Sequence, residues 1–588
     1  MKILLVAVNA KYIHSNLAVY SLKANCGCYE SQVKLMEYSI NQYPEEILRG
    51  IYREKADVVC FSCYIWNIQI IEQATRWLKM VSPEIRIWLG GPEVSFDVRE
   101  RLTDWTFIDG IMYGEGEDTF RDMAACWNGA ADIESVEGIG HRHPDGRVHV
   151  HPSRDFVDMS RLNFVYTRPE DFKNKIIYYE TSRGCPFRCS YCLSSVEKRV
   201  RFRDTALVKK DLQQFIDWEI PQVKFVDRTF NCQRDHSMDI LRFIKAQDKG
   251  KTNFHFEVTA DLLTEEELEF MAGLRPGLIQ LEIGVQSTNP ETLKEIRRNV
   301  SFEKLSEIVR RIHAGKNIHQ HLDLIAGLPF ENLERFKQSF DDVYGLKPEQ
   351  LQLGFLKVLK GSHMREKAGD YGLVYRPEPP YEVFSTRWLS YEDLLVLKSV
   401  EEMVEVYYNS RQFENSLEWL ETYFSSAFDM YEALAGYYER KGLDAVSHSR
   451  MARYEILLDF VSEHLGEEGR EIFVQLLTYD LYLRENVKSR PEWAGSQDEW
   501  KASYVAFFKD EANRETYFSG YDDYTTKQIQ RMTHIEHFTL DVPATVASGK
   551  TVAGSVFLWF DYLHRDPLTW RSRTVEVKID ENDEKTES

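Results

Sequence analysis

The sequence predicts an α/β protein, because short apolar strands alternate with amphipathic helical segments over roughly its first two thirds. These strands lack the polar alternation of a half-exposed sheet, which is typical of parallel sheets covered by helices on both faces. The alternation stops near residue 366, and residues 390–487 are mostly helical in pattern with aromatic-rich faces. We therefore expect an N-terminal doubly wound sheet, an open barrel of six βα units and a mainly α-helical C-terminal domain.

The composition is that of a globular protein with material for several cores. Of the 588 residues, 43% are hydrophobic and 28% are charged. The 94 acidic and 73 basic residues give a net charge of -21, which disfavours nucleic acid as a partner without excluding a local basic groove. No apolar run approaches the roughly 20 residues of a membrane-spanning helix. We expect a cytoplasmic protein with no membrane partner.

Residues 1–128 contain five candidate strands, from "KILLVAVN" to "DGIMYGEGE". Helical segments lie between them, so we expect a flavodoxin-like (Rossmann-like) parallel sheet. In such a sheet ligands bind beyond the carboxyl ends of the strands, where glycine lets the backbone approach a ligand. Polar residues and glycines follow four of the strands, which indicates a bound cofactor. The residues at these strand ends are Asn9, Ser62, Gly90, Gly91, Gly114 and Glu115.

Residues 129–172 are a predicted hairpin and linker around "HRHPDGRVHVHPSRD". The histidines of this stretch invite a metal interpretation. Alternate positions on an exposed hairpin are more often surface residues, and we expect surface residues here. The four histidines are His141, His143, His149 and His151.

Residues 173–366 contain six more strands separated by helices, which fits a partial (β/α)6 form of the eight-unit barrel with its chemistry at the C-terminal strand ends. In "SFEKLSEIVRRIHAG" the apolar residues fall on one helical face. Residues 367–580 are a predicted accessory domain, helical and then mixed, in which "MTHIEHFTLDV" and "GSVFLWFDYLHRD" resemble paired strands. The tail 581–588 is predicted to be disordered.

Three cysteines crowd the stretch "RGCPFRCSYC", which follows the first strand of the predicted barrel: Cys185, Cys189 and Cys192. Three thiolates on one short loop can hold three corners of a [4Fe–4S] cluster and leave one iron open to a small molecule. The alternatives are zinc with a distant fourth ligand, for which Cys232 is the nearest cysteine, or thiols without metal. Cys60 and Cys63 form a CxxC within an apolar strand and are predicted core residues.

The run "CPFRCSYC", including Tyr191 before the last cysteine, resembles the signature of the radical S-adenosylmethionine (SAM) superfamily, and the resemblance covers roughly residues 173–365. It implies that the open iron binds the amino and carboxylate groups of S-adenosylmethionine. It also implies that an electron passed through the cluster cleaves the sulfonium to a 5′-deoxyadenosyl radical, which requires an external electron donor such as flavodoxin or ferredoxin.

The same resemblance implies further contacts to S-adenosylmethionine, because polar residues stand at the matching strand positions. A satisfied polar layer inside the barrel is the alternative, since buried carboxylates need donors of some kind. The implied contacts are Tyr191, Asp227, Arg228, Glu257, Glu282, Gln286, Asp323 and Gly327, of which the last lies in a turn expected near the adenine.

A flavodoxin-like sheet directly before such a barrel resembles the radical SAM proteins that carry a B12 (cobalamin)-binding domain. The resemblance implies that cobalamin lies against the strand ends of residues 1–128, and that Asn9, Ser62, Gly90, Gly91, Gly114 and Glu115 contact it. The motif Asp-x-His-x-x-Gly is absent from this region, so the lower cobalt ligand is not predicted, and His14 is expected to be a loop or substrate-side residue. A methylthiotransferase would need a second set of cluster cysteines there, and no convincing set is present.

The leading hypothesis is an enzyme that methylates an unactivated carbon. The alternatives are a cobalamin-dependent radical cyclase or rearrangement catalyst without methyl transfer, and a non-catalytic cobalamin-binding regulatory protein. The C-terminal region resembles an accessory domain attached to some of these proteins, and His564, Arg565 and Asp566 lie in one of its turns, near the substrate or in a solvated loop. The substrate, the catalytic residues and the oligomeric state are not predicted.

Overall fold

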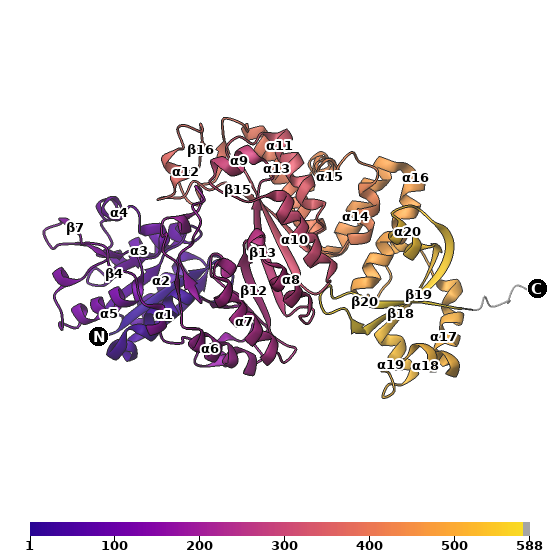
Figure 1. The fold of residues 1–588 in the computed structure, drawn as a ribbon, viewed down its shortest axis with the longest axis horizontal. Helices are drawn as coiled ribbons and strands as arrows, with labels where there is room; N and C mark the ends of the chain where they lie inside the picture. The colour runs from indigo at the N-terminus through magenta and orange to yellow at the C-terminus, as the bar shows by residue number, and fades with distance from the viewer. Residues whose placement is uncertain (580–588) are drawn as a thin grey trace, which may run out of the picture. The chain divides into compact units, whose positions relative to one another are not determined.

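The computed structural model describes residues 1–579, and contacts divide the chain into two compact units. The first unit comprises Met1–Phe336 and Gly354–Leu394; the second comprises Lys337–Leu353 and the described residues from Leu395 onward (Figure 1). None of the helices in residues 1–579 combines the length and the apolar composition that crossing a membrane requires.

The N-terminal sheet has the strand order β2-β1-β3-β4-β5-β6-β7, and its first five strands are parallel. The order of these five strands is that of a flavodoxin-like sheet, as predicted. Every residue of the central strands β1 and β3 is buried, which explains their lack of polar alternation. The five strands are β1 (Ile3–Asn9), β2 (Val33–Ser39), β3 (Val58–Ser62), β4 (Arg86–Gly90) and β5 (Gly110–Met112).

Four helices connect these strands, and a fifth, α5, follows the last of them. One pair packs together as α1 with α5 and another as α2 with α3. Side chains of the second pair and of α4 form one core with β1, β3 and β4. The helices are α1 (Leu17–Asn25), α2 (Pro44–Glu54), α3 (Ile68–Val81), α4 (Val98–Asp104) and α5 (Gly116–Trp127).

The predicted hairpin consists of β6 (Ile139–Arg142) and β7 (Val148–Val150), and it extends the first sheet at β5. The expectation that its histidines are surface residues is wrong for two of them. His141 and His151 are each only 4% exposed. The reason is tertiary: the short helix η3 (Ile133–Ser135) brings Glu134 against the hairpin, which local alternation does not reveal.

The second sheet has the order β15-β14-β13-β12-β11-β8, and the neighbours from β8 to β14 run parallel. The strands follow one another across the sheet in chain order, which confirms the predicted open array of six βα units. They are β8 (Ile177–Tyr179), β11 (Gln222–Phe225), β12 (Asn253–Val258), β13 (Ile279–Gln286), β14 (His319–Ala326) and β15 (Gln350–Phe355).

Helices alternate with these strands, several of them labelled beside β12 and β13 in Figure 1. In α10 the residues Leu305, Ile308, Val309 and Ile312 are buried, as the helical periodicity predicts. The helices are α6 (Thr205–Asp217), α7 (Arg234–Gln247), α8 (Glu265–Ala272), α9 (Pro290–Glu295), α10 (Phe302–Ala314) and α11 (Leu333–Tyr344). Short elements follow the last strand: α12 (His363–Glu366), β16 (Val374–Tyr375) and β17 (Val383–Ser385).

The C-terminal region is helical and then mixed, as expected. Its helical part is α13 (Tyr391–Met403), the π-turn η9 (Val404–Tyr408), α14 (Glu414–Glu421), α15 (Ala427–Lys441) and α16 (Arg450–Arg484). The mixed part is α17 (Lys501–Lys509), α18 (Glu511–Tyr517), α19 (Thr526–Met532), β18 (Thr533–Leu540), α20 (Val542–Ser548), β19 (Ala553–Arg565) and β20 (Ser572–Val577).

The two predicted paired strands of this region are β18 and β19, which run antiparallel, and β20 joins them as a third strand. Aromatic residues of the helices pack in the core: Tyr407 and Trp419 are buried, although Tyr423 is exposed. The predicted disordered tail, residues 581–588, lies outside the described residues.

Candidate active site

The predicted ligand loops of the first sheet meet at one edge, because the strands that precede them are parallel and in register. Ala7 pairs with Ser62, Ser62 with Gly90, and Gly90 with Met112. The loops that follow these strands therefore lie side by side at the carboxyl edge of the sheet, where doubly wound folds bind their ligands.

Two glycines of this edge have backbone conformations that favour glycine. Gly91 has φ 109°, and a Cβ atom there would lie 2.6 Å from the carbonyl oxygen of Cys63. Gly114 has φ 79°, and a Cβ atom there would meet nothing within 4 Å. The backbone at Gly114 thus borders open space that a ligand can occupy.

Asn9 and Glu115 use their side chains within the protein. Asn9 donates from Nδ2 to the carbonyl oxygen of His14 at 3.1 Å and to Glu37 at 3.0 Å, while its Oδ1 accepts from Asn16. Glu115 forms an ion pair with Arg201 at 2.6 Å and accepts a 2.6 Å hydrogen bond from the backbone of Val157. Both residues therefore order the loops around the sheet edge.

Aromatic side chains line the same edge, and the sequence analysis missed them. The rings of Tyr64 and Trp66, in the loop after β3, stack with their centroids 4.3 Å apart. Trp66 is 44% exposed, and Phe96 after β4 is 42% exposed. The signal in the sequence was the run "YIW" directly after an apolar strand. Exposed apolar rings at a ligand-binding edge fit a large flat ligand.

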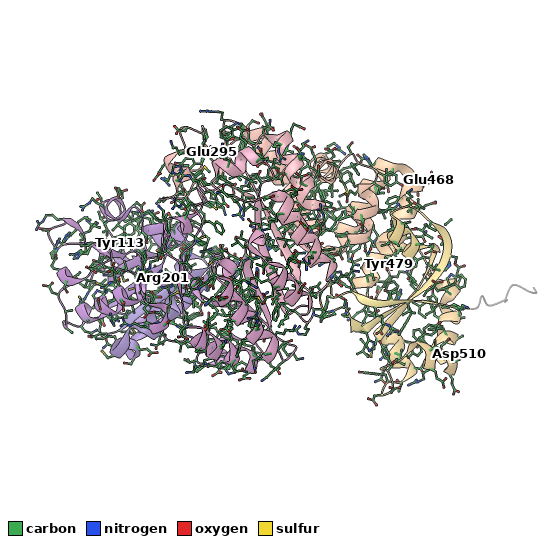
Figure 2. All side chains as sticks on the ribbon, in the orientation of Figure 1. Tyr113, Arg201, Glu295, Glu468, Tyr479 and Asp510 are labelled. Carbon is green, nitrogen blue, oxygen red and sulfur yellow. The ribbon has the colours of Figure 1, made fainter. Side chains whose placement is uncertain are left out.

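Ionic contacts join the carboxyl edge of the first sheet to the start of the barrel, within the first unit. Arg183 binds Glu117 at 2.7 Å, and Arg201, labelled in Figure 2, binds Glu115. Arg183 lies in β9 (Ser182–Arg183) and Arg201 in β10 (Arg201–Phe202), which pair with each other and bracket the cysteine loop. The end of the loop after β5 and the first turn of α5 therefore contact both ends of the segment that carries the three cysteines.

A second contact of this kind involves His14, which lies in the loop after β1. Its Nδ1 is 2.5 Å from the hydroxyl oxygen of Tyr178 in β8. Burial lowers the pKa of His14, and neighbouring lysines lower it further. His14 is thus a loop residue at the sheet edge, as expected.

The cysteine loop holds three free thiols. Cys185 and Cys189 are buried and Cys192 is partly buried. The loop turns at Gly184, where φ is 91° and a Cβ atom would lie 2.4 Å from the carbonyl oxygen of Arg199. Cys185 Sγ lies 3.8 Å from the hydroxyl oxygen of Thr229.

A cation lies against these thiols. Arg298 donates from Nη1 to Cys189 Sγ at 3.8 Å and from Nη2 to the carbonyl oxygen of Gly284. Its buried Nε has no hydrogen-bond partner within residues 1–579. Burial raises the pKa of Tyr191, the aromatic residue of the cysteine motif, and the nearby thiols add to the rise. A buried donor without a partner is unfavourable in a protein alone and is complementary to an anionic group.

Charged residues face one another on the inner side of the second sheet. Neighbouring strands place Glu257 beside Glu282, and Glu282 beside His321. Glu282 binds Lys224 at 2.9 Å and His255 at 3.0 Å. Burial opposes the ionisation of Glu282, but His255 and Lys224 outweigh it and lower its pKa to about 2. For Glu282 the alternative of a satisfied polar layer therefore describes the structure.

Glu257 and Gln286 are not satisfied in this way. The side chain of Glu257 makes no hydrogen bond or ion pair with the described part of the chain, and burial raises its pKa to about 7. Gln286 has φ 73° and a buried Oε1 with no partner among the described residues. Arg228 after β11 is exposed and opposes the rise in the pKa of Glu257. These three side chains offer a carboxylate, an amide oxygen and a guanidinium to a ligand.

Three other predicted contacts are used by the protein itself. Asp227 accepts from the backbone and the hydroxyl of Thr181 at 2.9 and 2.6 Å, and from the Ser182 hydroxyl at 2.6 Å. It thereby fixes the strand end before the cysteine loop, and burial raises its pKa to about 6. Asp323 lies 3.1 Å from His321 as an ion pair, but its buried Oδ1 has no partner with hydrogen-bond geometry within residues 1–579. Gly327 has φ 91°, and a Cβ atom there would lie 2.8 Å from Val383.

Comparison with known domain families agrees with this arrangement. The family model of the B12 binding domain matches residues 3–124, and that of the radical SAM superfamily matches residues 179–343. The chain belongs to the radical SAM proteins that carry a cobalamin-binding domain. The cofactors of this family are a [4Fe–4S] cluster, S-adenosylmethionine and cobalamin. A third model, a protein family of unknown function called DUF4080, matches residues 369–560.

Known relatives of this radical SAM protein include enzymes. The cobalamin-dependent radical SAM methyltransferase TokK of Streptomyces tokunonensis is 24% identical over 367 residues, which are 57% of this chain and 52% of TokK. The anaerobic magnesium-protoporphyrin IX monomethyl ester cyclase of Rubrivivax gelatinosus is 21% identical over 343 residues, 55% of this chain and 61% of the cyclase. The chain thus spans between about half and three fifths of the length of these relatives.

A solved structure shares the fold. The cobalamin-dependent S-adenosylmethionine radical enzyme OxsB with aqua-cobalamin bound superposes with a TM-score of 0.56 and 15% sequence identity, covering 82% of this chain and 79% of OxsB. This supports the architecture of a doubly wound domain before an open barrel.

The residues of this chain fit the cofactors of its family. The three thiols with the unused donor of Arg298 suit an anionic iron–sulfur cluster. The open space at Gly114 and the exposed ring of Trp66 suit a corrin with its nucleotide tail. The unsatisfied oxygen of Gln286 suits a donor group of S-adenosylmethionine.

Proposed function

We propose that this chain is a cobalamin-dependent radical SAM enzyme that methylates an unactivated carbon, with Cys185, Cys189 and Cys192 as the ligands of its [4Fe–4S] cluster. The observation that carries the proposal is the pair of contacts Arg183–Glu117 and Arg201–Glu115, which tie the cysteine loop to the ligand edge of the B12-binding domain. When bound, the cofactors supply a radical that removes a hydrogen atom from the substrate and a methyl group that replaces it.

The side chains of the site divide into two roles. Arg298 balances the charge of the cluster and its thiolates, while Asp227 holds Thr181 and Ser182 in place before the cysteine loop. Gln286, Glu257 and Arg228 bind the polar groups of S-adenosylmethionine, because their polar atoms are still available. The backbone at Gly91 and Gly114 receives cobalamin, and Trp66 packs against its ring.

The carboxyl edge of the first sheet and the cysteine loop of the barrel belong to the same compact unit, which favours the reaction through proximity. The methyl donor and the hydrogen acceptor act on the same carbon, so both have to reach it without an intervening release step. The loops after β1 and β5 contact the barrel directly, through His14–Tyr178 and through the two arginines that bracket the cysteine loop. Such contacts limit the access of water to the space between the two edges.

We also propose that the electron donor is a small redox protein such as flavodoxin or ferredoxin, and that the protein works in the cytoplasm. Nine cysteines without a disulfide support a reducing compartment. The domain boundaries that we propose are residues 1–128 for the cobalamin-binding domain, 173–366 for the radical SAM barrel and 367–580 for the accessory domain.

The test uses anaerobically reconstituted protein with a reductant, S-adenosylmethionine carrying a deuterated methyl group, and the small-molecule fraction of a cell extract as the source of substrate. Methylation predicts that S-adenosylhomocysteine forms together with 5′-deoxyadenosine and that a product gains the deuterium label. The control is the triple variant in which Cys185, Cys189 and Cys192 are alanine, which forms neither nucleoside product.

The second candidate function is a radical cyclisation or rearrangement, which the similarity to the Rubrivivax cyclase favours. In that case 5′-deoxyadenosine forms without S-adenosylhomocysteine, and no product gains the label. If neither nucleoside forms, the chain is a cobalamin-binding protein without this chemistry, and the proposal of an enzyme is wrong.

A further inference from the structure

One face of the β6–β7 hairpin carries four histidines. His141 lies directly opposite His149 across the antiparallel pair, and His143 and His151 each lie one residue beyond the end of their own strand, where backbone hydrogen bonds continue the pairing. Because successive side chains of a strand alternate between faces, and opposed residues share a face, all four imidazoles project to the same side. This convergence comes from the register of the pair, which the sequence alone does not state.

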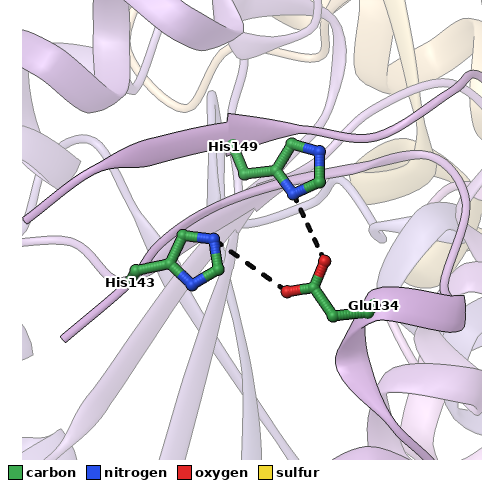
Figure 3. Close-up of side chains that lie close together, drawn as sticks. All are labelled: Glu134, His143 and His149. Carbon is green, nitrogen blue, oxygen red and sulfur yellow. Dashed lines mark ion pairs between the residues drawn. The ribbon is translucent and has the colours of Figure 1, made fainter. Parts of the chain in front are cut away.

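A carboxylate completes the cluster. Glu134 in η3 lies over this face, with Oε1 3.6 Å from Nε2 of His141 and 3.9 Å from Nε2 of His143. Its other oxygen lies 3.4 Å from Nδ1 of His149. Figure 3 shows the imidazoles of His143 and His149 turned toward the two oxygens of this carboxylate. Nε2 of His151 lies 3.2 Å from Nδ1 of His141.

These distances match the spacing of ligands around one small cation. Zinc–nitrogen bonds of about 2.0–2.1 Å in a tetrahedral site place neighbouring ligand atoms about 3.3–3.4 Å apart. Two groups of three ligand atoms meet the geometric requirement of lying within 4.8 Å of one another: Glu134, His143 and His149, and Glu134, His141 and His151. Glu134 belongs to both groups, so its carboxylate can act as a ligand together with either pair of histidines.

The imidazole rings of this cluster lie close together. The rings of His149 and His151 are 4.4 Å apart, and those of His141 and His143 are 4.6 Å apart. Imidazoles bind metal ions through a ring nitrogen, and the carboxylate of Glu134 beside them supplies an oxygen ligand and a negative charge that favour a divalent cation.

The opposite face of the hairpin is fixed against helix α4. A Cβ atom at Gly140 would lie 2.5 Å from Val98, and Arg142 donates to the carbonyl oxygen of Leu102. The histidine face is therefore held in place from behind. On its open side Glu134 and His149 have side chains that are 47% and 48% exposed, which leaves a path by which an ion enters.

We propose that Glu134, His141, His143, His149 and His151 form a binding site for one divalent transition-metal ion of the zinc class. The site is distinct from the cofactor edge, since His141 pairs with Gly110, the first residue of β5, whereas the cofactor edge lies beyond the last residue of that strand. Its role is structural: the ion joins η3 to β7, which is the last strand of the sheet.

The test measures metal binding and ligation in the full-length protein with its iron–sulfur cluster reconstituted. Zn²⁺ is titrated in competition with a chromophoric chelator, and the bound ion is characterised by X-ray absorption at the zinc edge. We expect one Zn²⁺ per chain with nitrogen and oxygen neighbours at about 2.0–2.1 Å and no sulfur neighbours at about 2.3 Å, which excludes binding to vacant cluster cysteines. This readout does not depend on catalytic activity.

Glu134→Gln is the decisive variant, because its partly exposed side chain can be changed without disturbing the core. It should weaken Zn²⁺ binding about tenfold or more, the range seen when even an outer partner of a metal site is removed. Glu137→Gln is the matched control, since it neutralises an exposed carboxylate of the same segment outside the cluster, and it should bind Zn²⁺ as the parent does. The proposal is wrong if the parent binds no Zn²⁺ at micromolar concentration, if sulfur ligates the ion, or if both variants bind equally.

Discussion

The contact of Arg298 with Cys189 predicts a measurable change in the reduction potential of the cluster. Replacing Arg298 by leucine removes a positive charge and the Nη1 donor that lies 3.8 Å from Cys189 Sγ. Reduction adds a negative charge to the cluster, and a nearby cation stabilises the reduced form more than the oxidised form. The variant should therefore have a more negative potential than the parent.

The structure sets the size of this shift. Two unit charges about 4 Å apart interact by about 4 kcal/mol at an effective dielectric constant of about 20. The added electron is spread over the whole cluster, so its interaction with Arg298 is weaker than that of two point charges. We therefore expect removal of the Arg298 charge to change the free-energy difference between the oxidised and reduced cluster by half of that energy, about 2 kcal/mol. That energy corresponds to about 90 mV for a one-electron couple.

The assay is a potentiometric titration of the reconstituted cluster without S-adenosylmethionine, followed by electron paramagnetic resonance. Arg298→Lys keeps the charge and should shift the potential by less than half as much. The matched control is Arg297→Leu, since Arg297 is exposed and contacts His363 rather than a cysteine. A potential for Arg298→Leu that equals that of the control, or lies above the parent, would refute the assignment of Arg298.

Four further predictions concern the cluster, the cobalamin edge and pH. Cys232→Ser should keep about four irons per chain by elemental analysis, whereas Cys192→Ser should lose most of them; a loss of iron in the first variant would make Cys232 a ligand. Gly91→Ala should destabilise the apoprotein by about 2–4 kcal/mol in chemical denaturation, because φ 109° is a glycine conformation and the added Cβ contacts backbone. The free energy of unfolding of Gly114→Ala should lie within about 2 kcal/mol of that of the parent. The variant should nevertheless bind cobalamin more weakly, as measured by the visible absorption of the bound cofactor; unchanged binding would show that Gly114 is not part of the site. Burial raises the pKa of Glu257 to about 7, so ionisation favours the unfolded state as the pH rises from about 4.5 to 7, and apoprotein stability should fall over that range. Glu257→Gln should lessen this fall, to which Asp227 also contributes, and be more stable than the parent at pH 8 by up to about 3 kcal/mol; parallel pH profiles would contradict the raised pKa.

The overall fold and the cysteine loop were predictable because their signals are local. Strands such as β1 and β3 are apolar along their whole length, and parallel strands separated by helices leave few topologies. The three cysteines lie within eight residues, so their proximity does not depend on the remainder of the fold. The carboxyl ends of the strands likewise follow from strand order once the sheet is recognised as parallel.

What the sequence did not predict depends on contacts between distant segments. Arg201 and Glu115 are 86 positions apart, and no periodicity connects them. The burial of His141 depends on η3 lying over the hairpin, and η3 is a single turn whose position is set by tertiary packing. Trp66 was visible in the sequence, but an aromatic residue after a strand belongs to the core more often than to a ligand edge.

The predicted contacts to S-adenosylmethionine and cobalamin show why a position at a strand end does not by itself identify a ligand contact. Asp227 and Glu115 both stand at strand ends, yet their carboxylate oxygens are occupied by Thr181, Ser182, Arg201 and the backbone of Val157. A buried polar group that already has its partners gains nothing from a ligand, whereas one without partners is stabilised when the ligand binds. By this criterion Gln286 and Asp323 are predicted contacts that gain from a ligand, since each has a buried oxygen without a hydrogen-bond partner within residues 1–579. Sequence position thus identifies the residues near the cofactors. Whether such a residue positions a loop or binds a ligand depends on whether its polar atoms already have hydrogen-bond partners in the folded chain.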